Sequence, residues 1–336
     1  MIEIIKVESK DQEREFVMFP FSLYKGCDYW VPPIISEELE SMDKEKNPVF
    51  ENAEAEFYIA KKDGVTVGRI AAMVNWVEIE EQKKNKLRFG WYDTIDDLEV
   101  SKKLLESVIE FGKKRKLEFV DGPVGFSNMD KAGLLIEGYE ELNTMITWYH
   151  YPYQKEHLKK LGFSKLAEWV EYKIKIFSAE DAPEKVKKFS KIIQQRYELK
   201  VLNFKSRKEI IPYVDKMFEL LNVTYSNLQT YVTIKQYQID FYKEKFIKYI
   251  HPDFIKCCLD KDDNLIAFLI TMPSFSRALK KINGKMGLMG YLRLFKAQHF
   301  NDRVSLYLIG VDPKYQSKGV TAVIFNELQN TFNKRG

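Results

Sequence analysis

Apolar residues near the end of the chain follow first a strand period and then a helix period. In residues 304–309, VSLYLI, Val or Leu occupies every second position among residues that favour strands, which predicts a β-strand. Pro313 lacks the N–H that a further ladder bond needs, so the strand ends before it. From Gly319 onward, apolar residues recur three or four positions apart, which predicts a helix. These residues are Val320, Ile324, Leu328 and Phe332.

The same two periods predict the elements of the first half of the chain. The expected order is strand, helix, hairpin, strand, helix, strand, loop, helix and strand. The predicted ranges are 2–7, 11–24, 57–62 with 65–76, 87–95, 98–115, 117–122, 124–139, 153–161 and 169–177.

A short polar segment, residues 178–184, is expected to link the two halves. The second half then repeats the element order of the first without a visible repeat of residues. Its predicted elements are a helix at 186–197, a strand at 199–204, helices at 207–222 and 235–250, a hairpin at 254–260 with 265–272, and a partly helical stretch at 280–303.

Composition narrows the class of protein. A chain of 336 residues with 45% hydrophobic and 30% charged residues is globular and has room for two domains. The net charge of +4 comes from interspersed charges, so we expect neither nucleic acid nor a membrane as a partner. The three cysteines lack metal spacing and indicate a reducing compartment. Without a signal peptide or an apolar run near 18 residues, a cytoplasmic protein without a metal is expected.

The junction between the last strand and the last helix is the main candidate for chemistry. The first N–H groups of a helix have no internal partner and carry partial positive charge, which suits a phosphate. Residues 311–321 read Val-Asp-Pro-x-x-Gln-x-x-Gly-x-Thr. This resembles the acetyl-CoA pyrophosphate loop of the GNAT acyltransferase superfamily, Gln/Arg-x-x-Gly-x-Gly/Ala, with Gln316 and Gly319 matching and Thr321 departing. The alternative is an ordinary strand-turn-helix whose glycine only shapes the loop.

The resemblance implies acetyl-CoA or another acyl-CoA as co-substrate. It also implies a bulge in the last strand at 309–311, where the thioester would enter and where backbone N–H groups would hold the oxyanion. The cofactor-binding residues so implied are Ile309, Gly310, Val311, Gln316, Ser317, Lys318, Gly319, Val320 and Thr321.

The first half also resembles a GNAT domain, in its element order and in Leu161-Gly162-Phe163, which is similar to the end of that family's fourth helix. Its cofactor loop departs from the pattern: residues 96–100 read DDLEV, and three carboxylates there would repel a pyrophosphate. We therefore expect an α/β mixed-sheet fold with two GNAT-like domains in tandem, at 1–177 and 185–336. The first is degenerate for CoA, and the second lacks its last elements, so the natural gene is expected to continue past Gly336.

Candidate reacting residues lie in the first half. Tyr149 and Tyr151 are candidates for an acid, although buried structural tyrosines are the favoured alternative. Asn128 and Asp130 are candidates for binding an amine, although Asx-type turns are favoured there.

The tandem arrangement resembles N-myristoyltransferases and Fem-type peptidyltransferases. It implies an acyl-CoA-dependent N-acyltransferase that moves an acetyl or other acyl group to an amine of a small molecule or peptide. Two alternatives stay open, a non-catalytic GNAT scaffold that binds a metabolite or partner, and an aminoacyl-tRNA-dependent Fem-like transferase. The sequence leaves the acyl chain length, the acceptor, the general base and acid, and the oligomeric state undetermined.

Overall fold

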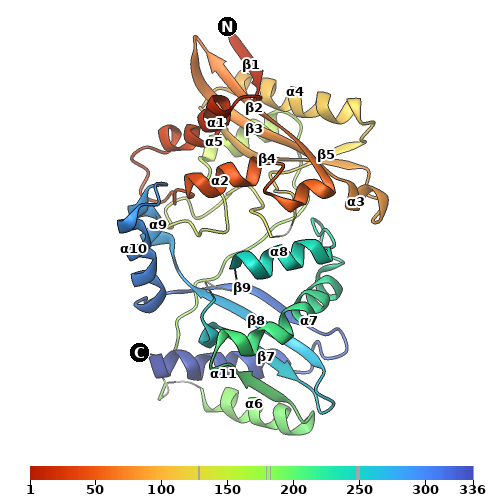
Figure 1. Ribbon diagram of the computed structural model, residues 1–336, viewed down its shortest axis with the longest axis vertical. Helices are drawn as coiled ribbons and strands as arrows, with labels where there is room; N and C mark the ends of the chain where they lie inside the picture. The colour runs from red at the N-terminus through yellow and green to blue at the C-terminus, as the bar shows by residue number, and fades with distance from the viewer. Residues whose placement is uncertain (128, 179, 182, 247–249, 336) are drawn as a thin grey trace. The chain divides into compact units, whose positions relative to one another are not determined.

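The computed structural model describes residues 1–336 apart from 128, 179, 182, 247–249 and 336. The chain divides into two compact units (Figure 1). Unit 1 comprises Met1–Trp169, Gln229–Val232 and Ser274–Asn301, and unit 2 comprises Val170–Leu228, Thr233–Pro273 and Asp302–Gly336. The division therefore runs through several chain segments and does not fall at a single linker.

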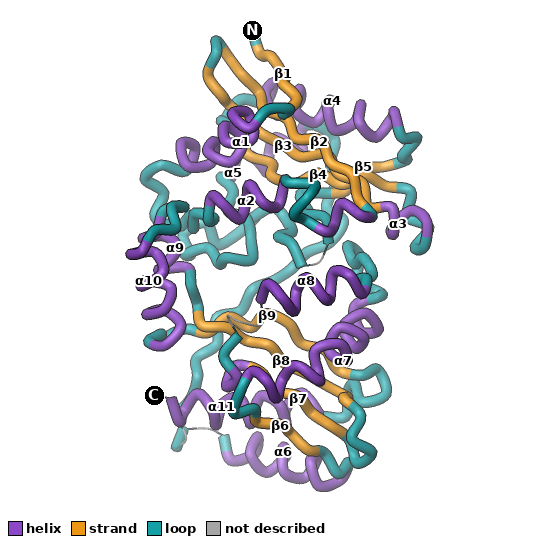
Figure 2. The backbone as a smooth tube through the Cα atoms, in the orientation of Figure 1, coloured by secondary structure: helices purple, strands orange, loops and turns teal. Residues whose placement is uncertain are grey.

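Unit 1 is built around a five-stranded sheet in the order β1-β2-β3-β4-β5, in which only β4 and β5 are parallel (Figure 2). The strands are β1 (Ile2–Lys6), β2 (Ala53–Lys62), β3 (Val65–Asn75), β4 (Lys86–Thr94) and β5 (Phe119–Asp121). The helices of its first 169 residues are α1 (Lys10–Leu23), α2 (Ile35–Met42), α3 (Trp76–Glu80), α4 (Leu98–Lys114) and α5 (Pro152–Lys160).

Both faces of this sheet are buried, because successive residues of β3 pack alternately into two separate hydrophobic cores, one on each face. Ile70 and Ala72 pack in the core that also holds the apolar side of α4. Ala71 and Met73 point the other way, into the core that holds Phe16 of α1. This explains why β3 is apolar almost throughout and does not alternate in hydrophobicity.

Two helices from late in the sequence complete unit 1, namely α9 (Ser276–Ile282) and α10 (Leu288–His299). The N–H of Ile35 donates to the carbonyl of Gly284 at 3.0 Å. Leu279 and Ile282 are buried against Val31. The predicted partly helical stretch at 280–303 is thus two helices. The two helices belong to unit 1 because their apolar residues pack against Val31 of that unit.

Unit 2 holds a four-stranded antiparallel sheet in the order β6-β7-β8-β9. Its strands are β6 (Lys200–Asn203), β7 (Ile255–Leu259), β8 (Leu265–Pro273) and β9 (Val304–Val311). Its helices are α6 (Glu184–Arg196), α7 (Arg207–Tyr225), α8 (Gln236–Phe246) and α11 (Val320–Arg335). One core packs α6 and α11 on the sheet, and α7 contacts β8 and β9.

The mixed α/β fold class is confirmed, one predicted strand is absent, and one helix is present that was not predicted. The predicted strand at 169–177 has no ladder partner, and its Tyr172 is 81% exposed, because alternation makes a strand only where another strand pairs with it. The helix predicted at 235–250 is present as α8 through Phe246, and residues 247–249 lie outside the described residues. The helix α2 was not predicted, since the two prolines before it indicated extended chain.

Candidate functional site

The loop between β9 and α11 is tightly folded on Asp312. The N–H of Asp312 donates to the carbonyl of Ile266 at 2.7 Å, which ends the pairing of β9 with β8. One Asp312 carboxylate oxygen accepts from the N–H of Lys314 at 2.7 Å, and its carbonyl accepts from the N–H groups of Tyr315 and Gln316. The Asx turn therefore fixes where the chain leaves the sheet.

Position 319 requires a glycine, both for the backbone conformation of the loop and for the close approach of neighbouring side chains. Its φ of +81° lies in the left-handed region, and Ser317 before it also has a positive φ, of +61°. A Cβ on Gly319 would lie 2.9 Å from Cε1 of Phe189 and 3.1 Å from Cγ1 of Ile193, both on α6. Any larger residue would push the loop away from α6.

The start of α11 presents donors that the protein does not use. Among the described residues, no acceptor faces the backbone N–H groups of Gly319, Val320 and Thr321, and the N–H of Ala322 donates to the Gly319 carbonyl at 3.0 Å. The side chains of Lys318 and Thr321 are exposed. These free N–H groups and the helix dipole together favour an anion at this end of α11.

Two side chains of the predicted site have structural contacts of their own. Gln316 Nε2 donates to the carbonyl of Val311 at 3.0 Å and closes the loop onto the end of β9. The Lys318 ammonium lies 5.6 Å from the ring centre of Tyr197 and 5.2 Å from that of Tyr315. These cation–π contacts hold the charge beside the loop.

The bulge of β9 lies two residues before the predicted position. The register against β8 shifts at Tyr307, because Leu306 pairs with Thr271 while Leu308 pairs with Ile270. Residues 309–311 are regularly paired. A Cβ on Gly310 would lie 2.5 Å from a carbon of the Phe268 ring, so close packing holds the strand flat there.

The corresponding helix start in unit 1 is closed by the protein itself. One Asp97 carboxylate oxygen accepts from the N–H of Glu99 at 3.0 Å, and the other lies 3.1 Å from the Lys62 ammonium. The neighbouring Asp96 lies 3.2 Å from Nε2 of His157. The carboxylates that the sequence placed at this loop thus occupy the beginning of α4.

Tyr149 and Tyr151 lie in an aromatic cluster around Tyr24. The ring centres of Tyr149 and Tyr24 are 5.5 Å apart, and those of Tyr151 and Tyr24 are 5.2 Å apart. The Tyr149 hydroxyl donates to the carbonyl of Tyr139 at 3.1 Å. Burial raises the pKa of both phenols, so both are protonated at neutral pH.

Asp130 folds its own turn. One of its carboxylate oxygens accepts from the N–H of Ser127 at 2.9 Å and from the Ser127 hydroxyl at 3.3 Å. Burial raises the pKa of Asp130. These contacts run back to Ser127, whereas an Asx turn accepts from the N–H two residues further on, so they differ from the Asx-type turn that the sequence favoured. Asn128 lies outside the described residues.

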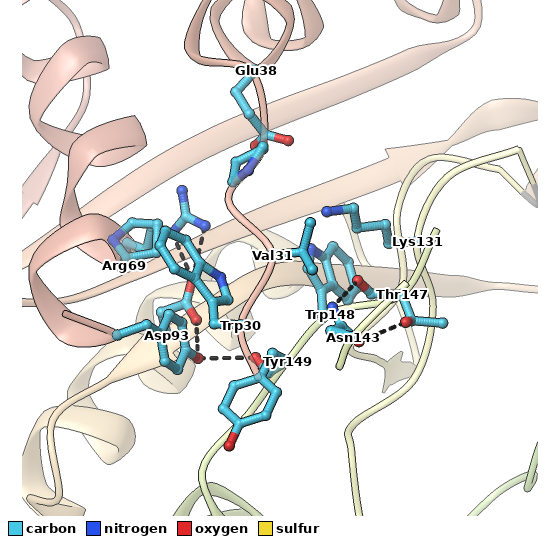
Figure 3. Close-up of a pocket in the computed structure, with 13 residues that line it drawn as sticks. Trp30, Val31, Glu38, Arg69, Asp93, Lys131, Asn143, Thr147, Trp148 and Tyr149 are labelled. Carbon is cyan, nitrogen blue, oxygen red and sulfur yellow. Dashed lines mark hydrogen bonds and ion pairs between the residues drawn. The ribbon is translucent and has the colours of Figure 1, made fainter. Parts of the chain in front are cut away.

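Unit 1 also contains a small pocket beside this cluster (Figure 3). Its floor is a buried ion pair: Nε of Arg69 lies 2.8 Å from the Asp93 carboxylate, which also accepts from the Tyr24 hydroxyl at 2.6 Å. Lys131 borders the pocket, and burial lowers its pKa. The volume of about 20 Å³ has room for a single water molecule.

Of the residues predicted from the sequence, only Tyr149 lines this pocket. Arg69 and Asp93 were missed, although they pair across β3 and β4. The available signal was the charged residues within two largely apolar strands, Arg69 in β3 and Lys86, Arg88 and Asp93 in β4, since buried charges require a partner.

The described residues offer neither a metal site nor a membrane-spanning helix. They contain no group of three or more His, Cys, Asp or Glu side chains that could hold a metal ion. Nor do they contain a helix with the length and hydropathy needed to cross a membrane.

No family model matches the chain. Protein YghO of Escherichia coli K12 is 25% identical over 322 residues, which cover 94% of this chain and 80% of that protein. The bacterial ceramide synthase of Caulobacter vibrioides is 21% identical over 325 residues, which cover 94% of this chain and 82% of the synthase.

Two solved structures align with the whole chain. One is the GCN5-related glucosamine N-acetyltransferase region of a fungal β-N-acetylglucosaminidase, with 9% identity, a TM-score of 0.49 and 34% of that protein covered. The other is a tandem GNAT protein from the clavulanic acid biosynthesis pathway, with 8% identity, a TM-score of 0.44 and 87% of that protein covered. Both are described as GCN5-related or GNAT proteins, the superfamily whose pattern residues 311–321 resemble.

Proposed function

We propose that this chain is an acyl-CoA-dependent N-acyltransferase whose unit 2 binds the diphosphate of the acyl-CoA. The observation that carries the proposal is the open beginning of α11, where three consecutive N–H groups, of Gly319, Val320 and Thr321, lack an acceptor among the described residues. The comparable position in unit 1 is filled by the Asp97 carboxylate. Only one of the two helix starts is therefore open to a phosphate.

Each predicted residue of the loop has a separate role in this proposal. Gly319 keeps the backbone close to α6, and Gln316 holds the loop on the end of β9. Lys318 adds a cation beside the N–H groups. Thr321 replaces the smaller residue of the GNAT pattern, and its exposed side chain at the first helical turn leaves its backbone N–H without a protein acceptor.

The reaction proposed is transfer of the acyl group from sulfur to nitrogen. The acceptor amine forms a C–N bond to the thioester carbonyl carbon, the C–S bond breaks, the amine proton passes to a base, and the thiolate takes a proton. Tyr149 and Tyr151 remain our candidates for the acid. Their protonated phenols suit donation, and their raised pKa values make them unsuitable as bases at neutral pH.

For the acceptor, the relative named for ceramide synthesis favours a particular class of amine. A ceramide is the amide of a fatty acid with a long-chain amino alcohol. The similarity covers 94% of this chain. Within the class of small-molecule amines, we therefore place a long-chain amino alcohol first and a long acyl-CoA as its donor.

The diphosphate site is tested by titrating acetyl-CoA and a long-chain acyl-CoA into the protein by calorimetry. We expect dissociation constants in the micromolar range for the parent. The Gly319→Asp variant should show no measurable binding, because the side chain adds bulk at a φ of +81° and a negative charge among the N–H groups. Lys318→Ala, which removes only the cation, should weaken binding by about tenfold.

Gly64→Asp is the matched control, since Gly64 has a φ of +78° but no atom within 4 Å of its position for a Cβ, and it lies in unit 1. Equal binding by the parent and the Gly319 variant would refute the diphosphate site. Binding by the parent without release of free thiol over a panel of amines would instead favour a non-catalytic scaffold.

A further inference from the structure

The outer face of α10 is apolar and exposed. Leu288, Tyr291, Leu292 and Phe295 follow the spacing i, i+3, i+4 and i+7, so they lie on one side of the helix. Leu288 is 79% exposed and Phe295 is 59% exposed. In Figure 1 the blue helices α9 and α10 lie beside the orange α2, to which the hydrogen bond of Ile35 with Gly284 connects them.

The opposite side of α10 is also apolar, but it is already packed. Gly290 is buried, and Leu294 packs in the cluster formed by Val31, Leu279 and Ile282. A helix that is apolar on both sides is typically covered on both sides. A contiguous exposed apolar surface of this kind marks an interaction site in a folded protein.

The chain segment that forms α9 and α10 carries charge of one sign. Residues 264–301 contain no Asp or Glu, although the chain as a whole has 49 acidic residues. The same segment contains six cations, which are Arg277, Lys280, Lys281, Lys285, Arg293 and Lys296. This exceeds the net charge of +4 of the entire chain. The net charge of the whole chain therefore does not reveal that residues 264–301 form a local cationic segment.

The exposed cations stand next to the exposed apolar residues. Lys281 is exposed in the last turn of α9, Lys285 is exposed on the turn that joins α9 to α10, and Lys296 is exposed on α10 next to Phe295. Two other cations of the segment are already engaged, since the Lys280 ammonium is paired with Asp28 at 3.2 Å and Arg293 donates to the carbonyl of Lys281 at 2.7 Å. The outer face of α10 and its border thus combine apolar side chains with available positive charge.

We infer that the outer face of α10 docks on the surface of an anionic lipid bilayer. Its apolar side chains would enter the boundary between headgroups and acyl chains, while Lys281, Lys285 and Lys296 would lie among lipid phosphates. With 12 residues, α10 lies on a membrane and does not span one. An anionic bilayer has a layer of negatively charged headgroups above an apolar layer of acyl chains. These two layers match the lysines and the exposed apolar side chains of this surface.

This inference replaces the expectation from total charge that the protein has no membrane partner. It does not depend on the proposed acyl transfer, because it uses no residue of the β9–α11 loop. Acyl-CoA binding and membrane docking can each hold without the other.

The test is sedimentation of the full chain with lipid vesicles. One set contains phosphatidylcholine with about one-third phosphatidylglycerol, and the other contains phosphatidylcholine alone. We expect strong binding to the first set, weak binding to the second, and release at high salt. The double variant Leu292→Glu/Phe295→Glu should bind at least about tenfold more weakly, and Lys281→Glu/Lys285→Glu should lose the preference for the anionic vesicles.

Val65→Glu is the matched control, since Val65 is 65% exposed in the same unit but lies on β3, and it should bind as the parent does. Urea unfolding followed by tryptophan fluorescence checks that each variant keeps its fold. The inference is wrong if the folded parent does not sediment with anionic vesicles, or if the face variant binds as well as the control. It is also wrong if the parent dimerises through this face, the face variant is monomeric, and neither binds vesicles.

Discussion

At the scale of single residues, unit 1 depends on charges buried inside its sheet. Glu78 is fully buried, and its two carboxylate oxygens lie 2.7 Å from Nε and NH2 of Arg88. The Lys86 ammonium lies 3.1 Å from Glu78 and 2.8 Å from Asp121. Arg88 NH2 also donates to the carbonyl of Thr230 at 2.8 Å. Two carboxylates thus balance two buried cations, and Glu78 is the one that contacts both cations.

Glu78→Gln should therefore destabilise unit 1 by about 3–5 kcal/mol, because it keeps the size of the side chain while leaving Arg88 without its charge partner. Glu54→Gln is the control. Glu54 pairs with Arg115 at 2.8 Å but is 47% exposed, so its loss should cost about 0–1 kcal/mol. The measurement is the free energy of urea unfolding followed by tryptophan fluorescence, which reports on unit 1 alone because all five tryptophans lie in it. Similar costs for the two variants would contradict this account.

At the scale of elements, α4 approaches β3 closely because Gly68 has no side chain. A Cβ there would lie 2.8 Å from Cδ1 of Leu104 and 2.9 Å from Cγ1 of Val100. Gly68→Ala should therefore cost about 1–3 kcal/mol of unfolding free energy by overpacking. In a Leu104→Ala background, which removes the nearest atom, the same change should cost less than half as much. An equal cost in both backgrounds would show that contact with Leu104 is not the cause.

Elements with strong local periods were predictable from the sequence. The strand and helix around the 311–321 loop are present as β9 and α11, because alternation, Pro313 and the helical stripe agree there. The segment 169–177 also alternates, but it has no strand to pair with, and pairing depends on residues far away in the chain. The helix α2 was missed because Pro32 and Pro33 indicate extended chain. Each proline restricts the backbone of the residue before it, and α2 begins after both, at Ile35.

The candidate site was likewise predictable only where its residues are consecutive in the sequence. The Gln-x-x-Gly pattern located the loop between β9 and α11, since its residues are consecutive. The bulge at Tyr307 and the Arg69–Asp93 pair depend on how strands align, which no local pattern encodes. The acidic start of α4 was interpreted correctly as a helix N-terminus, because Asp97 caps its own helix.

At the scale of the whole molecule, the two units interleave in sequence, because the chain returns to unit 1 at Ser274–Asn301. Leu279, late in the sequence, is buried with Val31 and Ile282 in a core of unit 1. A substitution in the second half of the chain should therefore weaken the unit formed mainly by the first half.

Leu279→Ala should lower the urea midpoint of the tryptophan transition by an amount equivalent to about 2 kcal/mol, since it removes a buried leucine side chain from a small cluster in unit 1. Leu328→Ala is the reciprocal variant. Leu328 is just as buried, but it lies on α11 in the core of unit 2, where the chain has no tryptophan. Its cost should appear in far-ultraviolet circular dichroism, with the tryptophan midpoint unchanged. If Leu328→Ala moved the tryptophan midpoint and Leu279→Ala did not, the assignment of α9 and α10 to unit 1 would be wrong, because the fluorescence would then follow the core of the other sheet.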